Sequence, residues 1–188
     1  MMTLEEAIKQ RAEAAALEAL DSDPAQATGE TQMGVSPLML ALYYELPNVA
    51  RAVRSKLTSV DFFEAAAMGD LGQVSHVVDK DPAMVDAFAK DGFTVLGLAI
   101  FFRQPALAKY LIEKGANVNL PASNARKVAP IHAACARQDL ESLRLLLAKG
   151  ADPNLAQEGG FTPLAAALAA KNQEMETILR EAGARADS

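Results

Sequence analysis

The residues best suited to chemistry in this sequence are its two histidines, His76 and His132, and its single cysteine, Cys135. His132 and Cys135 lie three positions apart, a spacing that places both side chains on one face of a helix. A zinc site needs about three or four protein ligands, and the sequence holds no second cysteine. We therefore expect no metal site, and we interpret Cys135 as a small core residue and His76 as a surface residue.

Sequence motifs for other kinds of catalysis do not occur. The sequence contains neither the Gly-x-Ser-x-Gly turn of many serine hydrolases nor the Gly-x-x-x-x-Gly-Lys-Ser/Thr loop that binds nucleotide phosphates. Neighbouring carboxylates, such as Glu5 with Glu6 and Glu174 with Glu176, are typical of solvated helix surfaces rather than of acid–base pairs. We predict no catalytic residue, no cofactor and no enzymatic activity.

The elements that carry these residues are expected to be helices. The chain has 188 residues, of which 51% are hydrophobic and 22% are charged, and it contains many alanines but no tryptophan. This composition favours helix-on-helix packing, and the length is sufficient for a substantial apolar core. The predicted fold class is all-α.

The second half of the sequence repeats itself with a period of 33 residues. The segment 129–134 (APIHAA) matches 162–167 (TPLAAA), and an earlier copy begins at Thr94. The loop after that copy, 120–128, is two residues longer. More divergent copies bring the number to six, and the predicted repeats are approximately 3–27, 34–57, 58–90, 91–125, 126–158 and 159–188 of a single domain that covers 1–188.

Each repeat predicts a pair of short helices. A Ser or Thr followed by Pro favours the start of the first helix, and a glycine in the left-handed conformation closes the second. Asp91-Gly92 and Gly159-Gly160, which lie between pairs, predict tight two-residue hairpin turns. A helix pair cannot bury its apolar face alone, so we expect the pairs to stack as a solenoid with one concave face.

Three motifs resemble one known family: GFTVL at 92–96, APIHAA at 129–134 and GFTPL at 160–164. They are similar to the ankyrin repeat, strongly from about residue 60 onward and more weakly before it. The opening FFEAA at 62–66 and the Asp-Pro pair at 81–82 resemble those of bacterial ankyrin repeat domain-containing proteins. The resemblance implies an all-α ankyrin solenoid in which His132 bonds the backbone of a neighbouring loop. The asparagines Asn117, Asn119 and Asn154 are interpreted as links between successive loops.

The repeats depart from the family pattern in two places. The second and third repeats begin only 24 residues apart, from Leu38 to Phe62, so the hairpin between them should be missing or reduced to 55–59. Val95 and Ala129 replace the Pro and Thr of the family, which weakens two helix starts by about 1 kcal/mol at most. At the N-terminus, apolar residues have the core spacing of the repeat 58 positions later and predict an integral cap: Leu4, Ile8, Ala16 and Leu20.

The expected binding surface combines the ends of the first helices with the hairpin tips. Successive first helices end in residue pairs that are aromatic in two repeats, and one member of each pair should face the groove. If it is the second member, Tyr44, Met68 and Phe102 form an apolar strip beside Arg137. The alternative, in which the rings pack between neighbouring helix pairs, remains open. Leu111, Leu146 and Leu147 are placed in the core of the second helices. The predicted partner-binding residues are Tyr43, Tyr44, Met68, Phe93, Phe101, Phe102, Arg126, Lys127 and Arg137.

The predicted function is that of a non-catalytic protein–protein interaction module, an adaptor or inhibitor that binds a partner protein of unknown identity through the groove and the tips. Two alternatives are a small-molecule-binding or enzymatic protein with a pocket near the shortened second-to-third repeat junction, and a secreted bacterial effector. The net charge of −6 disfavours nucleic acid, although residues 1–91 carry −8 and 92–188 carry +2. We expect a cytoplasmic monomer without membrane insertion.

Overall fold

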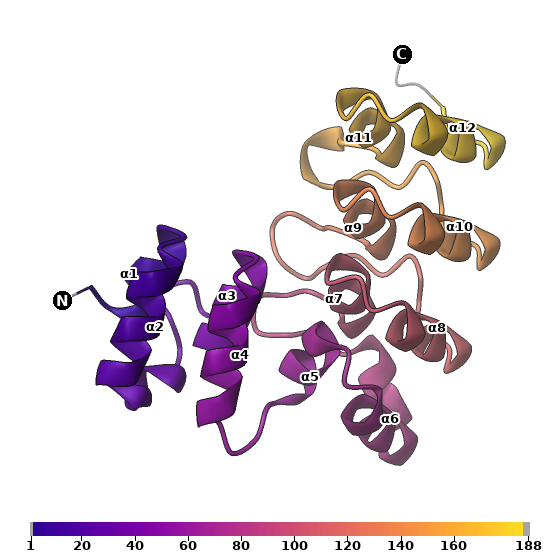
Figure 1. Ribbon diagram of the computed structural model, residues 1–188. Coiled ribbons are helices and arrows are strands. Elements are labelled where there is room, and N and C mark those ends of the chain that lie inside the picture. Colours follow the sequence, from indigo (N-terminus) through magenta and orange to yellow (C-terminus); the bar gives the residue numbers. More distant parts are fainter. Residues whose placement is uncertain (1, 186–188) are drawn as a thin grey trace. The chain divides into compact units, whose positions relative to one another are not determined.

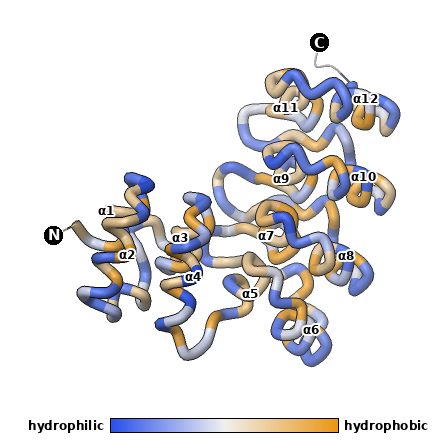
Figure 2. The backbone as a smooth tube through the Cα atoms, viewed as in Figure 1, coloured by the Kyte–Doolittle hydropathy of each residue, from blue (hydrophilic) through white to orange (hydrophobic). Residues whose placement is uncertain are grey.

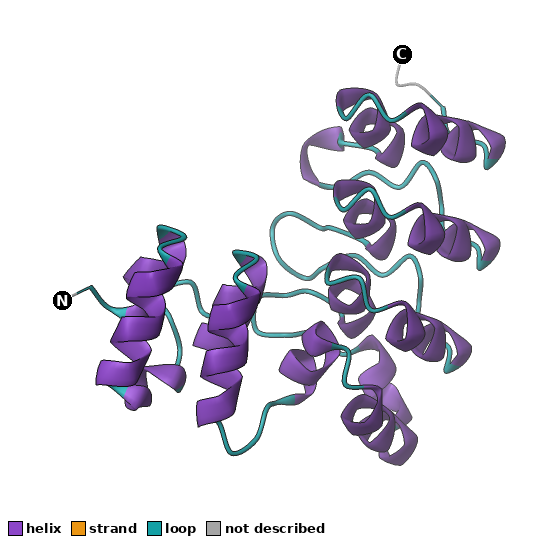
Figure 3. Ribbon diagram, viewed as in Figure 1, coloured by secondary structure: helices purple, strands orange, loops and turns teal. Residues whose placement is uncertain are grey.

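The computed structural model describes residues 2–185, which form helices joined by loops (Figures 1 and 3). Within these residues no strand forms, apart from one isolated antiparallel bridge between Phe88 and Thr94. The predicted all-α fold is therefore confirmed. The α-helices are α1 (Leu4–Lys9), α2 (Glu13–Ser22), α3 (Pro37–Tyr43), α4 (Pro47–Lys56), α5 (Phe62–Met68), α6 (Leu71–Lys80), α7 (Val95–Phe101), α8 (Pro105–Glu113), α9 (Pro130–Ala136), α10 (Leu140–Ala148), α11 (Pro163–Ala169) and α12 (Gln173–Glu181).

The chain divides into two compact parts, and the division falls between Ala67 and Met68. The N-terminal part contains α1 to α4 and nearly all of α5, whereas the C-terminal part contains α6 to α12. Short 3-10 helices follow α2 at η1 (Pro24–Ala27) and α6 at η2 (Pro82–Asp86), and a third, η3 (Glu158–Gly160), precedes α11. Figure 2 shows hydrophobic residues within the helices and hydrophilic residues at many of the turns between them.

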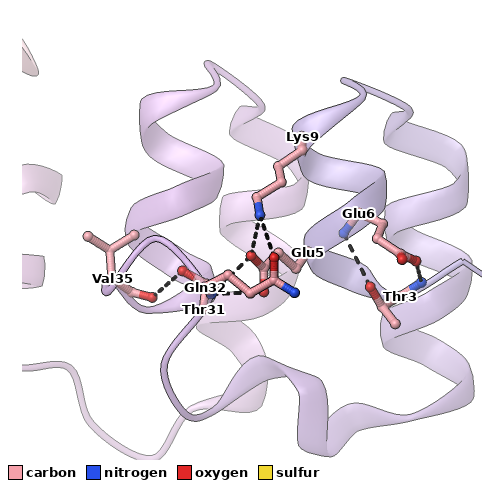
Figure 4. A network of polar contacts seen from close by, with 7 residues as sticks. All are labelled: Thr3, Glu5, Glu6, Lys9, Thr31, Gln32 and Val35. Atoms are coloured by element: carbon pink, nitrogen blue, oxygen red, sulfur yellow. Dashed lines mark hydrogen bonds and ion pairs between the residues drawn. The ribbon is translucent and has the colours of Figure 1, made fainter.

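In the N-terminal part, the pairs α1/α2 and α3/α4 pack side by side (Figure 1). The four apolar residues that predict an N-terminal cap are buried in this packing: Leu4, Ile8, Ala16 and Leu20. The start of α1 is fixed by a reciprocal cap, in which the Thr3 hydroxyl accepts from the Glu6 amide at 3.2 Å and the Glu6 carboxylate accepts from the Thr3 amide at 2.9 Å (Figure 4). The segment from Thr3 onward is thus part of the folded structure.

In the C-terminal part, α7, α9 and α11 form an inner row of helices, and α8, α10 and α12 form an outer row (Figure 1). Thr94 and Thr162 cap two inner helices by accepting from the amides of Gly97 (2.9 Å) and Ala165 (3.2 Å). Ala129 has no side-chain acceptor for α9, consistent with the weaker helix start predicted there. The outer helices are followed by glycines with positive φ, as expected: Gly115, Gly150 and Gly183.

The turn between the two helices of each repeat contains one residue in the left-handed conformation. These residues mark six repeats along the chain, and the step from Glu45 to Gly69 is 24 positions, the shortest of the series. The connection between α4 and α5 is correspondingly reduced to residues 57–61, which confirms the predicted loss of a hairpin there. The left-handed residues are Arg11, Glu45, Gly69, Arg103, Gln138 and Lys171.

Of the three leucines predicted to lie in the core of the outer helices, two are buried. Leu111 and Leu146 are fully buried, whereas Leu147 is only half-buried and its assignment to the core was wrong. Successive residues of an α-helix point about 100° apart, because one turn contains about 3.6 residues. Because Leu146 is fully buried, the next residue, Leu147, is turned partly toward solvent.

Candidate partner-binding surface

Four loops, which we call the fingers, precede α3, α7, α9 and α11. They are residues 31–35, 89–93, 122–128 and 157–161. In three of them a backbone amide donates to the carbonyl four positions later: Thr31 to Val35 (2.9 Å), Ala89 to Phe93 (2.8 Å) and Gln157 to Phe161 (3.1 Å). Three residues therefore separate each bonded pair, and the predicted two-residue turns were wrong. The residue added to each predicted turn is Lys90 or Glu158, and the positive φ of Gly92 and of Gly160 completes the reversal of the chain.

The finger at 122–128 is longer than the others. The Ala122 amide donates to the Val128 carbonyl at 3.0 Å, so five residues lie between the bonded pair, which accounts for the two extra residues in the sequence. Its tip is closed by the Lys127 amide, which donates to the Asn124 carbonyl at 3.2 Å, and by the Arg126 amide, which donates to the Asn124 side chain at 3.1 Å. Two adjacent exposed basic residues are thus presented on an ordered turn.

Lys127 has a φ of 49°, in the left-handed region that favours glycine. Lys127 directly precedes Val128, whose carbonyl accepts the bond that closes the finger. In each of the other fingers this position is a glycine: Gly34, Gly92 and Gly160. A lysine at this position carries a conformational cost that glycine avoids. The finger at 122–128 therefore departs from the others in length, charge and backbone strain.

The three fingers of the C-terminal part are bonded to one another in series. The Ser123 amide donates to the Gly92 carbonyl at 2.8 Å, and the Asn124 side chain donates to the Asp91 carbonyl at 2.8 Å. On the other side, the Glu158 amide donates to the Arg126 carbonyl at 3.0 Å. A Cβ atom at Gly92 would lie only 2.7 Å from the Asn124 nitrogen, so this close approach requires glycine. The fingers form one continuous, preorganised surface.

An apolar row runs along this surface. Phe93, Val128 and Phe161 occupy the same position, directly before the N-cap residue of each inner helix. Phe93 and Val128 are half-buried, whereas Phe161 is 42% exposed. The exposed side chains of Arg126 and Lys127 come from the middle finger, between the other two. Phe161 was missed by the sequence interpretation, although its spacing of one repeat from Val128 identifies it.

The aromatic pair at the end of α7 contacts the next repeat. The Phe101 ring lies 5.2 Å from the Phe102 ring in an edge-to-face arrangement, and the Arg137 guanidinium lies 5.1 Å from the Phe101 ring centre. The Arg103 side chain donates to the Arg137 carbonyl at 2.5 Å. Phe101, the first member of its pair, is therefore packed between repeats, as the alternative interpretation of these rings expects.

The predicted binding residues do not lie at one place. Phe93, Arg126 and Lys127 belong to the fingers, whereas Phe101, Phe102 and Arg137 lie at the opposite ends of the inner helices. A helix of seven residues, such as α7, is about 10 Å long, which sets the distance between these groups. Tyr43 and Tyr44 end α3 in the N-terminal part and are half-buried, as is Met68 at the end of α5. Their roles in binding stay predictions.

The two side chains best suited to chemistry, His132 and Cys135, have structural roles. His132 is 5% exposed, accepts from the Ala129 amide through Nδ1 at 3.1 Å and donates through Nε2 to the Leu155 carbonyl at 2.8 Å. Burial lowers the pKa of His132, so the imidazole is neutral at pH 7. Burial raises the pKa of the Cys135 thiol to about 12, so it is not a thiolate. His76 is exposed, as predicted.

The polar loops on the outer side have a structural role as well. The Asn119 side chain accepts from the Asp152 amide at 2.8 Å and donates to the Gly150 carbonyl at 2.9 Å, and Asn154 bonds Gly183 and Arg185 in the same way. These bonds confirm the predicted links between loops for Asn119 and Asn154. The prediction was wrong for Asn117, whose side chain accepts from the Asn119 amide of its own loop at 2.9 Å. In the part of the chain that the structure describes, no three metal-ligating side chains gather at one point, and no helix is long and apolar enough to cross a membrane.

Comparisons with known proteins agree with this geometry. A family model described as "Ankyrin repeat" matches residues 91–123, and one described as "Ankyrin repeats (many copies)" matches residues 131–178. The human BCL-6 corepressor-like protein 1 is 32% identical over 119 residues, which are 63% of this chain and 7% of that protein. The human ankyrin repeat domain-containing protein 63 is 32% identical over 108 residues, which are 55% of this chain and 28% of that protein.

The chain therefore spans less than a third of the length of these curated relatives. A solved structure covers much more of it: the crystal structure of an ankyrin repeat domain from Acinetobacter baumannii aligns over 97% of this chain and 98% of that one, with a TM-score of 0.59. The sequence identity is 23%, so this likeness shows the fold. Both family models match within the C-terminal part, where the fingers are bonded in series.

Proposed function

The chain belongs to the ankyrin repeat family, and we propose that it is a non-catalytic module that binds a partner protein through the fingers of its C-terminal part. The observation that carries this proposal is the continuous finger surface, in which backbone hydrogen bonds fix three fingers before any partner arrives. A preorganised surface loses little conformational entropy on binding, which favours affinity. Phe93, Arg126 and Lys127, together with Phe161, are the proposed contact residues.

The structural roles of His132 and Cys135 support the proposal that the module is non-catalytic. Both hydrogen bonds of the imidazole go to backbone groups, and the thiol is protonated and buried, so neither group is available as a base or a nucleophile. A module without its own reaction acts by occupying or bringing together surfaces, as an adaptor or an inhibitor does. A bacterial and cytoplasmic setting for that role is part of the proposal.

The ends of the inner helices are a secondary part of the proposed surface. Phe101 and Arg137 hold neighbouring repeats together, so we expect their loss to affect stability more than partner contact. Phe102 is half-buried beside them and remains a proposed contact residue, as do Tyr43, Tyr44 and Met68.

Site-specific photo-crosslinking in the native cell tests the proposal. A photoreactive amino acid replaces Ala125, which is exposed on the finger at 122–128, or Ala106, which is exposed on the outer helix α8 as a matched control. We expect one partner protein to be crosslinked from position 125 and not from position 106. Equal yields from both positions, or no crosslinked protein from position 125, would contradict binding through the fingers.

A further inference from the structure

We propose that the partner contributes an acidic segment, with an apolar side chain flanked by carboxylates, that lies along the apolar row of the fingers. This inference rests on the proposed function and names the chemistry of the partner. The apolar side chain packs against Phe161 and its neighbours Val128 and Phe93. The carboxylates pair with Arg126 and Lys127, because a guanidinium binds a carboxylate through two parallel hydrogen bonds.

The charge of the C-terminal part is divided between its two sides. The fingers, the inner helices and the turns that follow them, residues 87–104, 122–138 and 156–172, carry six basic and two acidic side chains. The remaining described residues of this part, which include the outer helices, carry seven basic and eleven acidic side chains. One of the two acidic residues on the finger side, Asp91, accepts from the Phe93 amide at 3.3 Å. The finger side is therefore complementary to an acidic partner.

The conformation of Lys127 is a separate observation in favour of the same surface. The backbone geometry at this position suits glycine, which the other fingers use, yet this finger has a lysine. The other non-glycine residues with a left-handed φ lie in the turns within repeats, so among the described fingers Lys127 stands alone. Backbone strain of this kind is often found at functional sites. Contact between the Lys127 charge and a partner would explain why this finger has a lysine despite the unfavourable φ.

A protein segment fits this surface better than a nucleic acid does. The N-terminal part carries five basic and ten acidic side chains, and the whole chain has a net charge of −6, which would repel a polyanion along its length. The positive charge is confined to the fingers and the inner side, where an acidic segment contacts it locally. The apolar row also matches a partner with aliphatic or aromatic side chains rather than a phosphate backbone.

Selection from a library of random peptides displayed on phage tests this inference with the full chain as bait. We expect the selected peptides to be enriched in Asp and Glu by about twofold or more over the starting library, around a hydrophobic residue. A synthetic copy of one selected peptide should bind the Lys127→Gly and Arg126→Ala variants at least about fivefold more weakly. It should bind Lys109→Ala, which removes an exposed charge from outer helix α8, within about twofold of the original protein.

Several results would overturn the inference. Selected peptides without acidic enrichment, or an empty selection, show that the partner chemistry is wrong, and so does tighter binding of a DNA duplex than of the peptide. A dimer that dissociates in the Lys127→Gly variant shows that the acidic N-terminal part of a second copy is the occupant. Crosslinking from position 125 reports separately on the proposed function, because it does not depend on the charge of the partner.

Discussion

The two parts of the molecule use the same helix pairs but hold their fingers differently. In the N-terminal part, the finger at 31–35 is tied to α1 by the Glu5 carboxylate, which accepts from the Gln32 amide at 3.0 Å and from Lys9 at 2.6 Å (Figure 4). In the C-terminal part, the fingers are tied to one another by backbone groups. A finger that is bonded to a helix, such as 31–35 to α1, stands as a single loop, whereas fingers that are bonded to one another form a continuous surface. This difference is why we propose binding through the C-terminal part and a more structural role for the N-terminal part.

The largest expected effects come from core truncations placed in each part. Leu20→Ala in the N-terminal part and Leu111→Ala in the C-terminal part remove fully buried side chains, and each should lower the free energy of unfolding of its own part by about 2–5 kcal/mol. Hydrogen exchange read by mass spectrometry locates the loss. Equal loss of protection in both parts from either variant would show that they unfold as one cooperative unit, and the comparison would then lose its basis.

Alanine at the finger glycines compares the two ways of holding a finger. Gly92→Ala should lose about 1–2 kcal/mol for the left-handed conformation, and in addition about 0.5–1.5 kcal/mol for each bond to the neighbouring finger that it breaks. Gly34→Ala in the N-terminal part, where the nearest atom lies 3.6 Å from the added Cβ, should show the first loss alone. Thermal unfolding measures the stability lost in each variant. Equal losses would mean that the hydrogen bonds between fingers contribute nothing to stability.

The sequence predicts these elements well where the determinant is local. The threonine caps and the glycines after the outer helices act within one repeat, so the helices follow from the residues themselves. The missing hairpin follows from a spacing that can be counted in the sequence, the 24-residue step between the second and third repeats. The bonds between fingers use main-chain amides and carbonyls, which every residue offers, so no side-chain pattern reveals them. The contact of Arg137 with Phe101 also depends on the register between two repeats, which spacing within one repeat does not fix.

Truncation of the aromatic rings separates packing from binding. Phe101→Ala should cost about 1–2 kcal/mol of stability, because it removes both the edge-to-face contact with Phe102 and the contact with the Arg137 guanidinium. Phe161→Ala, at a ring that is 42% exposed, should leave the melting temperature nearly unchanged and weaken binding of the selected peptide. Binding that is lost only in Phe101→Ala would move the recognition surface to the ends of the inner helices.

Acid should weaken the C-terminal part before the N-terminal part, because the buried His132 lies in the former. The pKa of His132 is lowered in the folded state by burial, so its contribution to stability is complete above the unfolded pKa of about 6.5 and is lost as the pH falls toward the folded value. The folded carboxyls whose pKa is lowered, Glu6 and Asp79, respond only at lower pH. Hydrogen exchange at about pH 7 and about pH 5 should show a loss of protection around α9 and the loop at Leu155. Uniform loss across both parts would contradict this assignment.

The smallest expected effect is a gain in stability at left-handed residues that are not glycine. Lys127→Gly in the middle finger and Arg11→Gly in the N-terminal part, with φ values of 49° and 54°, should each raise the free energy of unfolding by about 0.5–1 kcal/mol, because glycine adopts this conformation without steric cost. The gains should be equal if both positions are only structural turns. Binding of the acidic peptide then distinguishes them, since Lys127→Gly should stabilise the protein and weaken the complex, whereas Arg11→Gly should leave the complex unchanged. A lysine that folding disfavours and binding requires marks the middle finger as the functional difference between the two parts, and an unchanged complex in Lys127→Gly would remove that distinction.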